Sequence, residues 1–328
     1  MLTEVSKETY RKHFQTDPHP YISEGFLGLV EDKAEKTIRL MDESNKSMGL
    51  VLGVKDNALC SPFSAPFGGF HFSHEYLFYE VIFNFVEDLR TFVKVNDFKT
   101  VNITLPPDIY HINTNAKSIN ALIRAGYTMG TPDITNWIDL LSFNGKWTYD
   151  KVANKCRRAI KHQLTFEQAS DDISRQEAYR VIYNNRAELD RRIHMSLDDI
   201  LEVEKIMPVD FFLVKERTGE SAGAGIFYRG HEKVVQGIFM GDDLKKRDLG
   251  IIDFLYLNLY DHYKQSGYHF VDFGTSSQNG EPNSGLIRFK EIHNCATSLR
   301  HRFSWVNGDL ESSISEQQLK TKDNAAHF

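Results

Sequence analysis

Cysteine is scarce in this chain, and several other features that would reveal a function at once are missing. The 328 residues include three cysteines, Cys60, Cys156 and Cys295, which lie far apart. An odd and scattered set does not form a disulfide framework, so we expect a protein of the reducing cytoplasm. No segment reaches the roughly 20 apolar residues that cross a bilayer. The polar N-terminal stretch, MLTEVSKETYRKHFQ, lacks the apolar core of a secretory signal.

The chain also lacks an excess of positive charge. Its 39 lysines and arginines face 45 acidic residues, giving a net charge of −6. A surface of this balance does not attract DNA or an anionic membrane as a whole. Metal chemistry is not indicated either: His71 and His74 lie three apart, but no third ligand accompanies them. The sequence contains no Cys-x-x-Cys, no Gly-x-Ser-x-Gly and no phosphate loop of the nucleotidase kind.

What the chain does have is a regular alternation of strand-like and helix-like segments, repeated once. Its 41% hydrophobic and 12% aromatic residues are enough for a well-packed core. The first half predicts strands at residues 36–41, 47–54 and 100–105, with a Pro/Gly loop and a helix at 74–95 before the last strand. Between Phe211 and Phe273 the second half predicts the same order. Tight hairpins within each half favour an α/β fold with mixed sheets.

The Asn144-Gly145 turn is the predicted boundary between the two halves. We therefore expect an N-terminal domain at residues 1–144 and a C-terminal domain at 145–308. Residues 309–328 are polar and poor in aromatics, and they are expected to form a loosely held tail.

The most informative stretch runs over residues 221–290. Two apolar strands lead into the polar loop GDDLKKRDLG, and a helix is predicted at 251–265, ended by Gly267. A basic loop followed by a helix N-terminus favours anions, because the first N–H groups of a helix have no partner within it. A phosphate-bearing ligand is expected to contact Lys245, Lys246, Arg247 and Gly250. A solvated charged turn is the alternative interpretation of the same residues.

Four motifs in the second half resemble one known superfamily. They are Arg247-Asp248-Leu249-Gly250-Ile251-Ile252, the basic stretch Asn154-Lys155-Cys156-Arg157-Arg158-Ala159-Ile160-Lys161, the strand Val271-Asp272-Phe273-Gly274, and Gly285-Leu286-Ile287-Arg288-Phe289-Lys290. Together they are similar to the GCN5-related N-acetyltransferases, in particular to the Fem-type branch, which carries two such domains in tandem. The resemblance covers roughly residues 20–305. Ile252 stands where the superfamily's phosphate-binding loop has glycine or alanine.

The resemblance implies an acyltransferase of two tandem acetyltransferase-like domains. An acyl-CoA co-substrate would lie in the second domain, and the residues expected to bind it are Gln236, Phe239, Lys245, Lys246, Arg247, Leu249, Gly250 and Ile251. The acceptor would be the amine of a small molecule or peptide, acylated by direct attack without a metal. Fem enzymes use aminoacyl-tRNA, so a tRNA-dependent ligase is one alternative. A non-catalytic binding module is another.

Two residues are candidates for chemistry. Lys290 matches a lysine that lies at the Fem active site, and an ammonium there would stabilise the oxyanion of a tetrahedral intermediate. It would equally fit a surface position on an amphipathic segment, with Arg288 on the same face if the segment is extended. Asp272 ends an apolar strand, so it would either take a proton from the attacking amine or cap the following loop.

The remaining candidates concern substrate binding. Arg157 and Arg158 lie on a predicted basic amphipathic helix, and Arg186 lies on the next helix. These three would bind an anionic acceptor or the donor phosphates, or else form a solvated face. Ser276 and Asn283 occur in a Gly/Ser/Asn loop, where they would contact substrate or serve only as turn residues.

Overall fold

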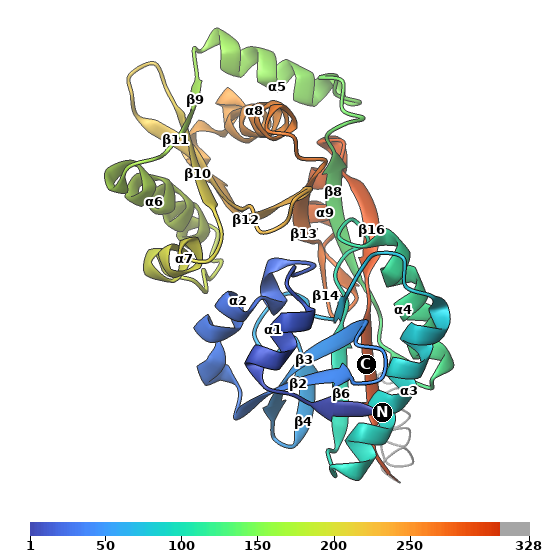
Figure 1. Cartoon of the computed structure of the whole chain (residues 1–328). Coiled ribbons are helices and arrows are strands. Elements are labelled where there is room, and N and C mark those ends of the chain that lie inside the picture. The colour runs from blue at the N-terminus through green and yellow to red at the C-terminus, as the bar shows by residue number, and fades with distance from the viewer. Residues whose placement is uncertain (309–328) are drawn as a thin grey trace, which may run out of the picture. The chain divides into compact units, whose positions relative to one another are not determined.

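A computed structural model describes residues 1–308, and the predicted tail at 309–328 lies outside the described residues. The chain divides into two compact units. Among the described residues, the first contains Met1–Pro132 and residues 301–308, and the second is Asp133–Arg300. Each unit is built on one large mixed sheet with helices packed against it (Figure 1). The predicted α/β fold with mixed sheets is therefore confirmed.

The first unit holds a sheet in the order β1-β2-β3-β4-β6-β17-β7, with β5 pairing β3. Its strands are β1 (Leu2–Glu4), β2 (Lys36–Asp42), β3 (Met48–Lys55), β4 (Ala58–Ser61), β5 (Phe70–Phe72), β6 (Thr100–Thr104), β7 (Thr128–Met129) and β17 (Arg302–Val306). Its helices are α1 (Lys7–His13), η1 (Pro20–Ile22), α2 (Glu24–Leu29), η2 (Glu31–Lys33), α3 (Tyr79–Val95) and α4 (Ile112–Arg124).

The second unit holds a sheet in the order β16-β8-β13-β12-β11-β10-β9. Its strands are β8 (Asp133–Asp139), β9 (Thr165–Gln168), β10 (Val209–Lys215), β11 (Ser221–Tyr228), β12 (Val234–Asp242), β13 (Phe270–Thr275) and β16 (Ala296–Arg300), with a small hairpin of β14 (Ser277–Gln278) and β15 (Glu281–Pro282). Its helices are α5 (Asp150–Lys161), α6 (Asp172–Glu188), α7 (Leu197–Glu204), η3 (Leu244–Leu249), α8 (Ile251–Gln265) and α9 (Ser284–Ile292).

The predicted internal repeat is present in the topology. In the first unit the antiparallel strands β2, β3 and β4 lead through α3 to β6, which lies parallel to β4. In the second unit β10, β11 and β12 lead in the same way through α8 to β13, which lies parallel to β12. A parallel connection needs a crossover, and here a long helix provides it in both units.

The division of the chain differs from the predicted boundary at 144/145. Strand β8 precedes that boundary but lies between β13 and β16 in the second sheet. Strand β17 comes from the far end of the sequence and completes the first sheet beside β6. The Asn144-Gly145 signal marks a turn inside the second unit, with Gly145 at φ +79°. Pairing between strands that are distant in sequence leaves no local signal in the composition. A boundary defined by such pairing therefore could not be predicted from the Asn144-Gly145 turn.

The helices of the second unit cover both faces of its sheet (Figure 1). On each face a helix approaches the sheet closely at a glycine. A Cβ atom on Gly223 of β11 would lie 2.3 Å from Cγ2 of Ile251 in α8, whereas one on Gly241 of β12 would lie 2.9 Å from Cβ of Asn185 in α6. Helix α5 packs on α8, where the Cys156 thiol lies 3.3 Å from the Asp253 carbonyl. These close approaches fix the ends of β11 and β12 between two helical layers.

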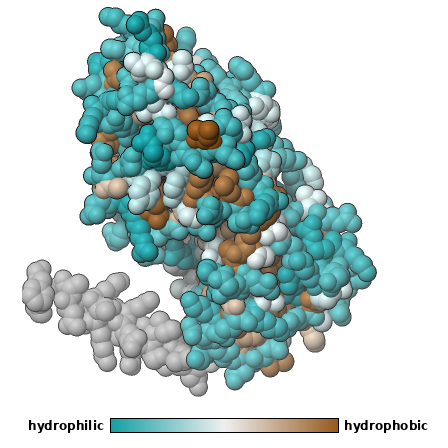
Figure 2. Space-filling view, turned by 90° about the vertical axis from the view of Figure 1, so that its left-hand side faces the viewer, coloured by the Kyte–Doolittle hydropathy of each residue, from teal (hydrophilic) through white to brown (hydrophobic). Residues whose placement is uncertain are grey.

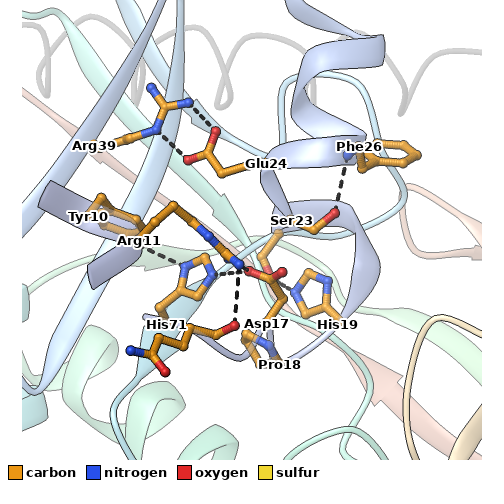
Figure 3. A network of polar contacts seen from close by, with 12 residues as sticks. Tyr10, Arg11, Asp17, Pro18, His19, Ser23, Glu24, Phe26, Arg39 and His71 are labelled. Carbon is orange, nitrogen blue, oxygen red and sulfur yellow. Dashed lines mark hydrogen bonds and ion pairs between the residues drawn. The ribbon is translucent and has the colours of Figure 1, made fainter. Parts of the chain in front are cut away.

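A buried polar network holds the N-terminal segment of the first unit (Figure 3). His71 is 1% exposed, and its ring lies between the Tyr10 hydroxyl at 2.8 Å and the Asp17 carboxylate at 3.0 Å. Arg11 donates to the same carboxylate at 2.9 Å. The network therefore connects α1 and the loop after it to β5.

On the face shown in Figure 2 the surface is largely hydrophilic, although brown patches of hydrophobic residues reach it. Exposed apolar side chains on α6 include Ile173 and Tyr183. None of the helices within residues 1–308 is both long and apolar enough to span a membrane.

Candidate functional site

The central strand β12 of the second unit separates from its neighbour halfway along. Residues 234–236 pair with 270–272 of β13, and the pairing stops there. On its other edge β12 stays paired with β11 as far as Asp242, through an irregularity at Ile226/Phe227. Residues 237–240 therefore face an opening on the β13 side and are half-buried. We call this stretch the β12 opening.

The matching position in the first unit is closed. Strand β4 pairs with β6 along its whole length, from Ala58 to Ser61. The repeat thus produces an opening between parallel strands in the second unit and none at the equivalent place in the first. Two predicted contacts lie at the β12 opening, since Gln236 is the last paired residue and Phe239 is half-buried within it.

The η3 loop (residues 243–250) leads from β12 to the start of α8. Gly250 occupies the left-handed region at φ +78° and serves as N-cap of α8, where no side chain caps the helix. A Cβ atom on Gly250 would lie 2.6 Å from the Lys155 carbonyl oxygen. The helix therefore begins on a bare backbone turn, whose first N–H groups, including those of Ile251 and Ile252, have no acceptor within α8.

The cations of the η3 loop are placed differently from the sequence-based expectation. The Lys246 ammonium lies 2.5 Å from a Glu216 oxygen and 2.8 Å from a Glu220 oxygen, so two neighbouring carboxylates neutralise it. Arg247 lies 3.5 Å from the Asp242 carboxylate. The exposed Lys245 side chain has no ion pair within the part of the chain that the structure describes. Leu249 packs against the core instead of facing solvent.

The basic helix α5 lies against the η3 loop. Arg158 donates to the Asp248 carbonyl oxygen at 2.9 Å. Three further exposed cations of α5, Lys151, Arg157 and Lys161, form no ion pair among residues 1–308. The predicted substrate residues Arg157 and Arg158 are thus on the helix that borders the loop and the first turn of α8.

A buried charge cluster beneath this turn was missed from sequence. Asp253 is 3% exposed, and its carboxylate lies 3.1 Å from Lys155 and 3.3 Å from His293. The other ring nitrogen of His293 lies 2.7 Å from the Phe289 carbonyl and donates to it, because a carbonyl oxygen can only accept. Burial alone would raise the pKa of Asp253, but His293 and Lys155 hold it below its ordinary value. The three residues lie far apart in sequence, so no motif marks them.

Lys290 belongs to a helix, because the segment GLIRFK forms part of α9 and is not extended. Its side chain is 4% exposed, and the ammonium donates to the carbonyl oxygens of Phe273, Gly274 and Thr275 at 2.8, 2.9 and 3.2 Å. Burial lowers the pKa of Lys290 to about 8, although nearby Asp272 opposes the shift. All three N–H groups of the ammonium are therefore engaged by main-chain acceptors.

Asp272 is 1% exposed, and its carboxylate accepts the Gly274 N–H at 2.8 Å. This is the loop-capping geometry that was one of its two predicted roles. Its position next to Lys290 places both candidates for chemistry at the bend where β13 leaves β12.

The two predicted loop contacts serve the local fold. Ser276 is 1% exposed, and its hydroxyl donates to the Asn136 side chain at 2.6 Å. Asn283 is the N-cap of α9 and accepts the Leu286 N–H at 3.0 Å. Asn283 itself is exposed, so its remaining amide group faces solvent.

Arg186 on α6 is half-buried without a counter-ion. Its Nε atom is buried and has no hydrogen-bond partner among residues 1–308, and the side chain makes no ion pair there. Burial and the neighbouring Arg191 lower the pKa of Arg186. The nearby acidic residues Glu188 and Asp190 form no ion pair with it, and a partly buried guanidinium without a counter-ion is costly.

The neighbouring Asn185 fixes the end of β12. It donates to the main-chain and side-chain oxygens of Asp242 at 2.7 and 2.9 Å, and burial raises the pKa of that carboxyl. Within the described ranges, no group of three or more His, Cys, Asp and Glu side chains is arranged to hold a metal ion.

Comparison with known proteins places this geometry in a recognised fold. No protein-family model matches the chain, and no curated protein matches it. Solved structures do match over nearly its whole length. FemX has a TM-score of 0.68 at 10% identity, over 96% of this chain and 99% of that one. L-PGS from Bacillus licheniformis has a TM-score of 0.61 at 13% identity, over 95% of both chains.

A tandem GNAT protein from the clavulanic acid biosynthesis pathway has a TM-score of 0.52 at 10% identity, over 94% of this chain and 98% of that one. The predicted Fem-type arrangement of two tandem acetyltransferase-like domains is therefore confirmed as the fold of this chain. At these identities the likeness extends to the fold alone, and function has to be argued from the site.

Proposed function

We propose that this protein is an acyltransferase that moves an acyl group from an acyl-CoA thioester to an amine. One observation carries the proposal: β12 stops pairing with β13 at Gln236 while it stays paired with β11 to Asp242. The unpaired peptide groups of the β12 opening lead directly into a glycine turn at a helix N-terminus. An extended ligand that ends in phosphates has the matching chemistry.

The donor would lie along the second unit in two parts. The amide-containing arm of coenzyme A would hydrogen-bond to the free backbone of residues 237–240, between Gln236 and the η3 loop. The Gly250 N–H already donates to the Arg247 carbonyl, so Gly250 would shape the turn. The pyrophosphate would accept the N–H groups of Ile251 and Ile252, with Lys245 adding a screened charge. Lys246 and Arg247, already paired with carboxylates, would shape the loop rather than contact phosphate directly.

The reaction would be a direct transfer. The lone pair of the acceptor amine attacks the thioester carbonyl carbon, the C–S bond breaks, an amide forms, and the amine proton leaves with the thiolate or solvent. A covalent cysteine intermediate is not favoured, because burial raises the pKa of Cys156 and of Cys295 to about 12. Thiols of this kind are poor nucleophiles near neutral pH.

The acceptor would approach from the α6 side of the sheet. The half-buried guanidinium of Arg186 lacks a partner in residues 1–308, and an anionic group on the acceptor would supply one. Asn283 offers an exposed amide at the start of α9, whereas the buried hydroxyl of Ser276 would act only through Asn136. We therefore propose an amine that also carries a carboxylate or phosphate.

A thermal-shift titration tests the donor. Acetyl-CoA, longer acyl-CoAs and CoA should each raise the unfolding midpoint, because a ligand that binds only the folded state stabilises it. Pantetheine lacks the phosphates and should shift the midpoint much less. If no thioester shifts the midpoint at millimolar concentration, the proposal fails.

A matched pair of variants localises that binding. Lys245→Glu should weaken CoA binding roughly three- to tenfold, since it reverses a charge next to the proposed pyrophosphate. Lys233→Glu, at the opposite end of β12, should leave the dissociation constant unchanged. Equal effects of the two variants would point to nonspecific attraction.

A second candidate donor is aminoacyl-tRNA, and the exposed cations of α5 favour it. Among residues 1–308, Lys151, Arg157 and Lys161 form no ion pair, and they belong to the helix that contacts the η3 loop through Arg158. If this helix binds a polynucleotide, tRNA affinity should fall steeply as salt rises. For each tenfold increase in salt concentration, the logarithm of the binding constant should fall by about 0.7 for every phosphate contacted. Arg157→Glu should reduce that slope. Salt-sensitive tRNA binding without any CoA binding would favour the ligase.

The third candidate is a non-catalytic protein of the same fold, and it predicts a different set of results in these assays. Such a protein would bind CoA but release none from acetyl-CoA over a panel of amines with carboxylate or phosphate groups. Detection of free thiol in the presence of any one amine would exclude it.

A further inference from the structure

The bend of β13 leaves backbone groups that the sheet does not satisfy. After Asp272 the strand leaves β12, and its pairing with β8 is irregular until Thr275. Gly274 takes φ +71°, a conformation that glycine adopts at little cost. The carbonyls at this bend need other partners, since buried main-chain groups are seldom left without hydrogen bonds.

Lys290 supplies these partners from α9. Its three N–H groups meet three carbonyl oxygens, those of Phe273, Gly274 and Thr275, at 2.8–3.2 Å. From the other side, the Asp272 carboxylate accepts the Gly274 N–H at 2.8 Å. Two buried charged side chains therefore hold one short turn of backbone.

The alternative to this bend is continued pairing of the two parallel strands. Residues 237–240 of β12 have free peptide groups on the edge that faces β13, and the carbonyls at 273–275 would be available to them if Lys290 were absent. Continued pairing would satisfy both sets of groups and close the β12 opening. The contacts of Lys290 and Asp272 prevent this by engaging the β13 groups first.

We infer that Lys290 and Asp272 are positioning residues that keep the two strands apart and so set the width of the β12 opening. The inference rests on the proposed function only where it predicts donor binding. It differs from a role in stabilising an oxyanion, because the ammonium has no N–H left for a reacting group. Removing Lys290 should therefore impair donor binding itself and not turnover alone.

Lys264 provides a matched control. It is also a lysine of the second unit that donates to a main-chain carbonyl, that of Phe143, at 2.6 Å. That contact lies away from the bend of β13. Lys264→Met removes the same chemical group as Lys290→Met, and no effect on the opening is expected from it.

The test combines hydrogen exchange of the free protein with CoA titration of the same variants. In Lys290→Met the two strands should continue to pair, so amide exchange at residues 237–240 and 273–276 should slow by tenfold or more. CoA binding should weaken at least tenfold. Lys264→Met should change neither exchange nor binding. Lys290→Gln, which keeps an N–H donor and harms folding less, should give an intermediate effect on both readouts.

Each outcome is decisive. Unchanged exchange at both segments in Lys290→Met, or in Lys290→Gln if the methionine variant does not fold, would overturn the inference. Unchanged CoA affinity with loss of turnover would also overturn the inference. That result would indicate that Lys290 contacts the reacting atoms, as in the predicted oxyanion role. If the unaltered protein binds no CoA, the proposed function fails, and the exchange readout still decides the role of Lys290.

Discussion

The ammonium of Lys155 lies 3.1 Å from the Asp253 carboxylate, and this ion pair ties the basic helix α5 to the first turn of α8. His293, the C-cap residue of α9, approaches the same carboxylate at 3.3 Å. Three helices therefore meet at one buried anion beneath the proposed phosphate site. The cluster gives the bare N-terminus of α8 a fixed position.

Asp253→Ala should lower the free energy of unfolding by about 3 kcal/mol, because removing one partner of a buried pair leaves its charge uncompensated. Glu202→Ala is the control, since it breaks the exposed Lys205–Glu202 pair and should cost less than about 1 kcal/mol. Urea unfolding of both variants measures the difference. Similar costs would show that the Asp253 cluster is not a structural centre.

The conformation of Gly250 allows a second test. Gly250→Ala should destabilise the protein by about 3 kcal/mol, since the left-handed backbone costs about 1–2 kcal/mol and the new methyl group would meet the Lys155 carbonyl. Gly267 has φ +86° and no atom within 4 Å of an added Cβ, so Gly267→Ala should show the backbone cost alone. Thermal denaturation of the pair isolates the contact with α5. Equal losses would contradict that contact.

His71 predicts a dependence of stability on acid. Burial lowers the pKa of His71 below its ordinary value of 6.5, despite the Asp17 partner (Figure 3). The unfolded chain therefore takes up a proton first as pH falls below about 6.5, and stability is lost from there down to the folded pKa, by at most about 1.4 kcal/mol per pH unit. Stability measured in urea at pH 7.5 and 5.5 should show this fall.

His71→Phe should be less stable at both pH values, because Tyr10 and Asp17 lose their partner, but its loss on acidification should be smaller than that of the unaltered chain. His74→Asn changes an exposed histidine and should keep the full dependence. An unchanged slope in His71→Phe would assign the acid sensitivity to other groups.

Lys290 predicts a dependence of the same sign in alkali. Its pKa is about 8 in the folded protein and 10.5 ordinarily, so between these values the unfolded chain binds more protons. The contribution of Lys290 to stability should therefore rise with pH across this window, by about 3 kcal/mol at most. Comparing urea unfolding of the unaltered chain with Lys290→Met at pH 7.5 and 9.5 reveals the difference in slope. Parallel slopes would mean that the lysine is not buried as described.

The sequence was informative wherever a local signal determined the structure. Helix α8 runs from Ile251 to Gln265 as predicted, because its apolar spacing is regular and Gly267 follows it. The repeated order of elements predicted the tandem architecture for the same reason. In contrast, GLIRFK is short and apolar, and periodicity alone did not distinguish a strand from the helix that Asn283 caps.

Features that depend on distant contacts were not predictable. The sequence predicted that Lys246 would contact phosphate. In the structure Glu216 and Glu220, which lie on either side of the turn between β10 and β11, neutralise its charge. Asp253 and His293 gave no signal because their contact joins two helices. The loop departs from the acetyltransferase pattern at Ile252, where the side chain packs partly against the core.

The most direct test of the central claim is hydrogen exchange of the full chain with and without acetyl-CoA. The account predicts protection of residues 237–252, with no change at residues 58–80, the equivalent segment of the first unit. Because the two units repeat one topology, the first serves as an internal control. Protection in the first unit alone, or in neither unit at saturating acetyl-CoA, would contradict a donor site at the β12 opening.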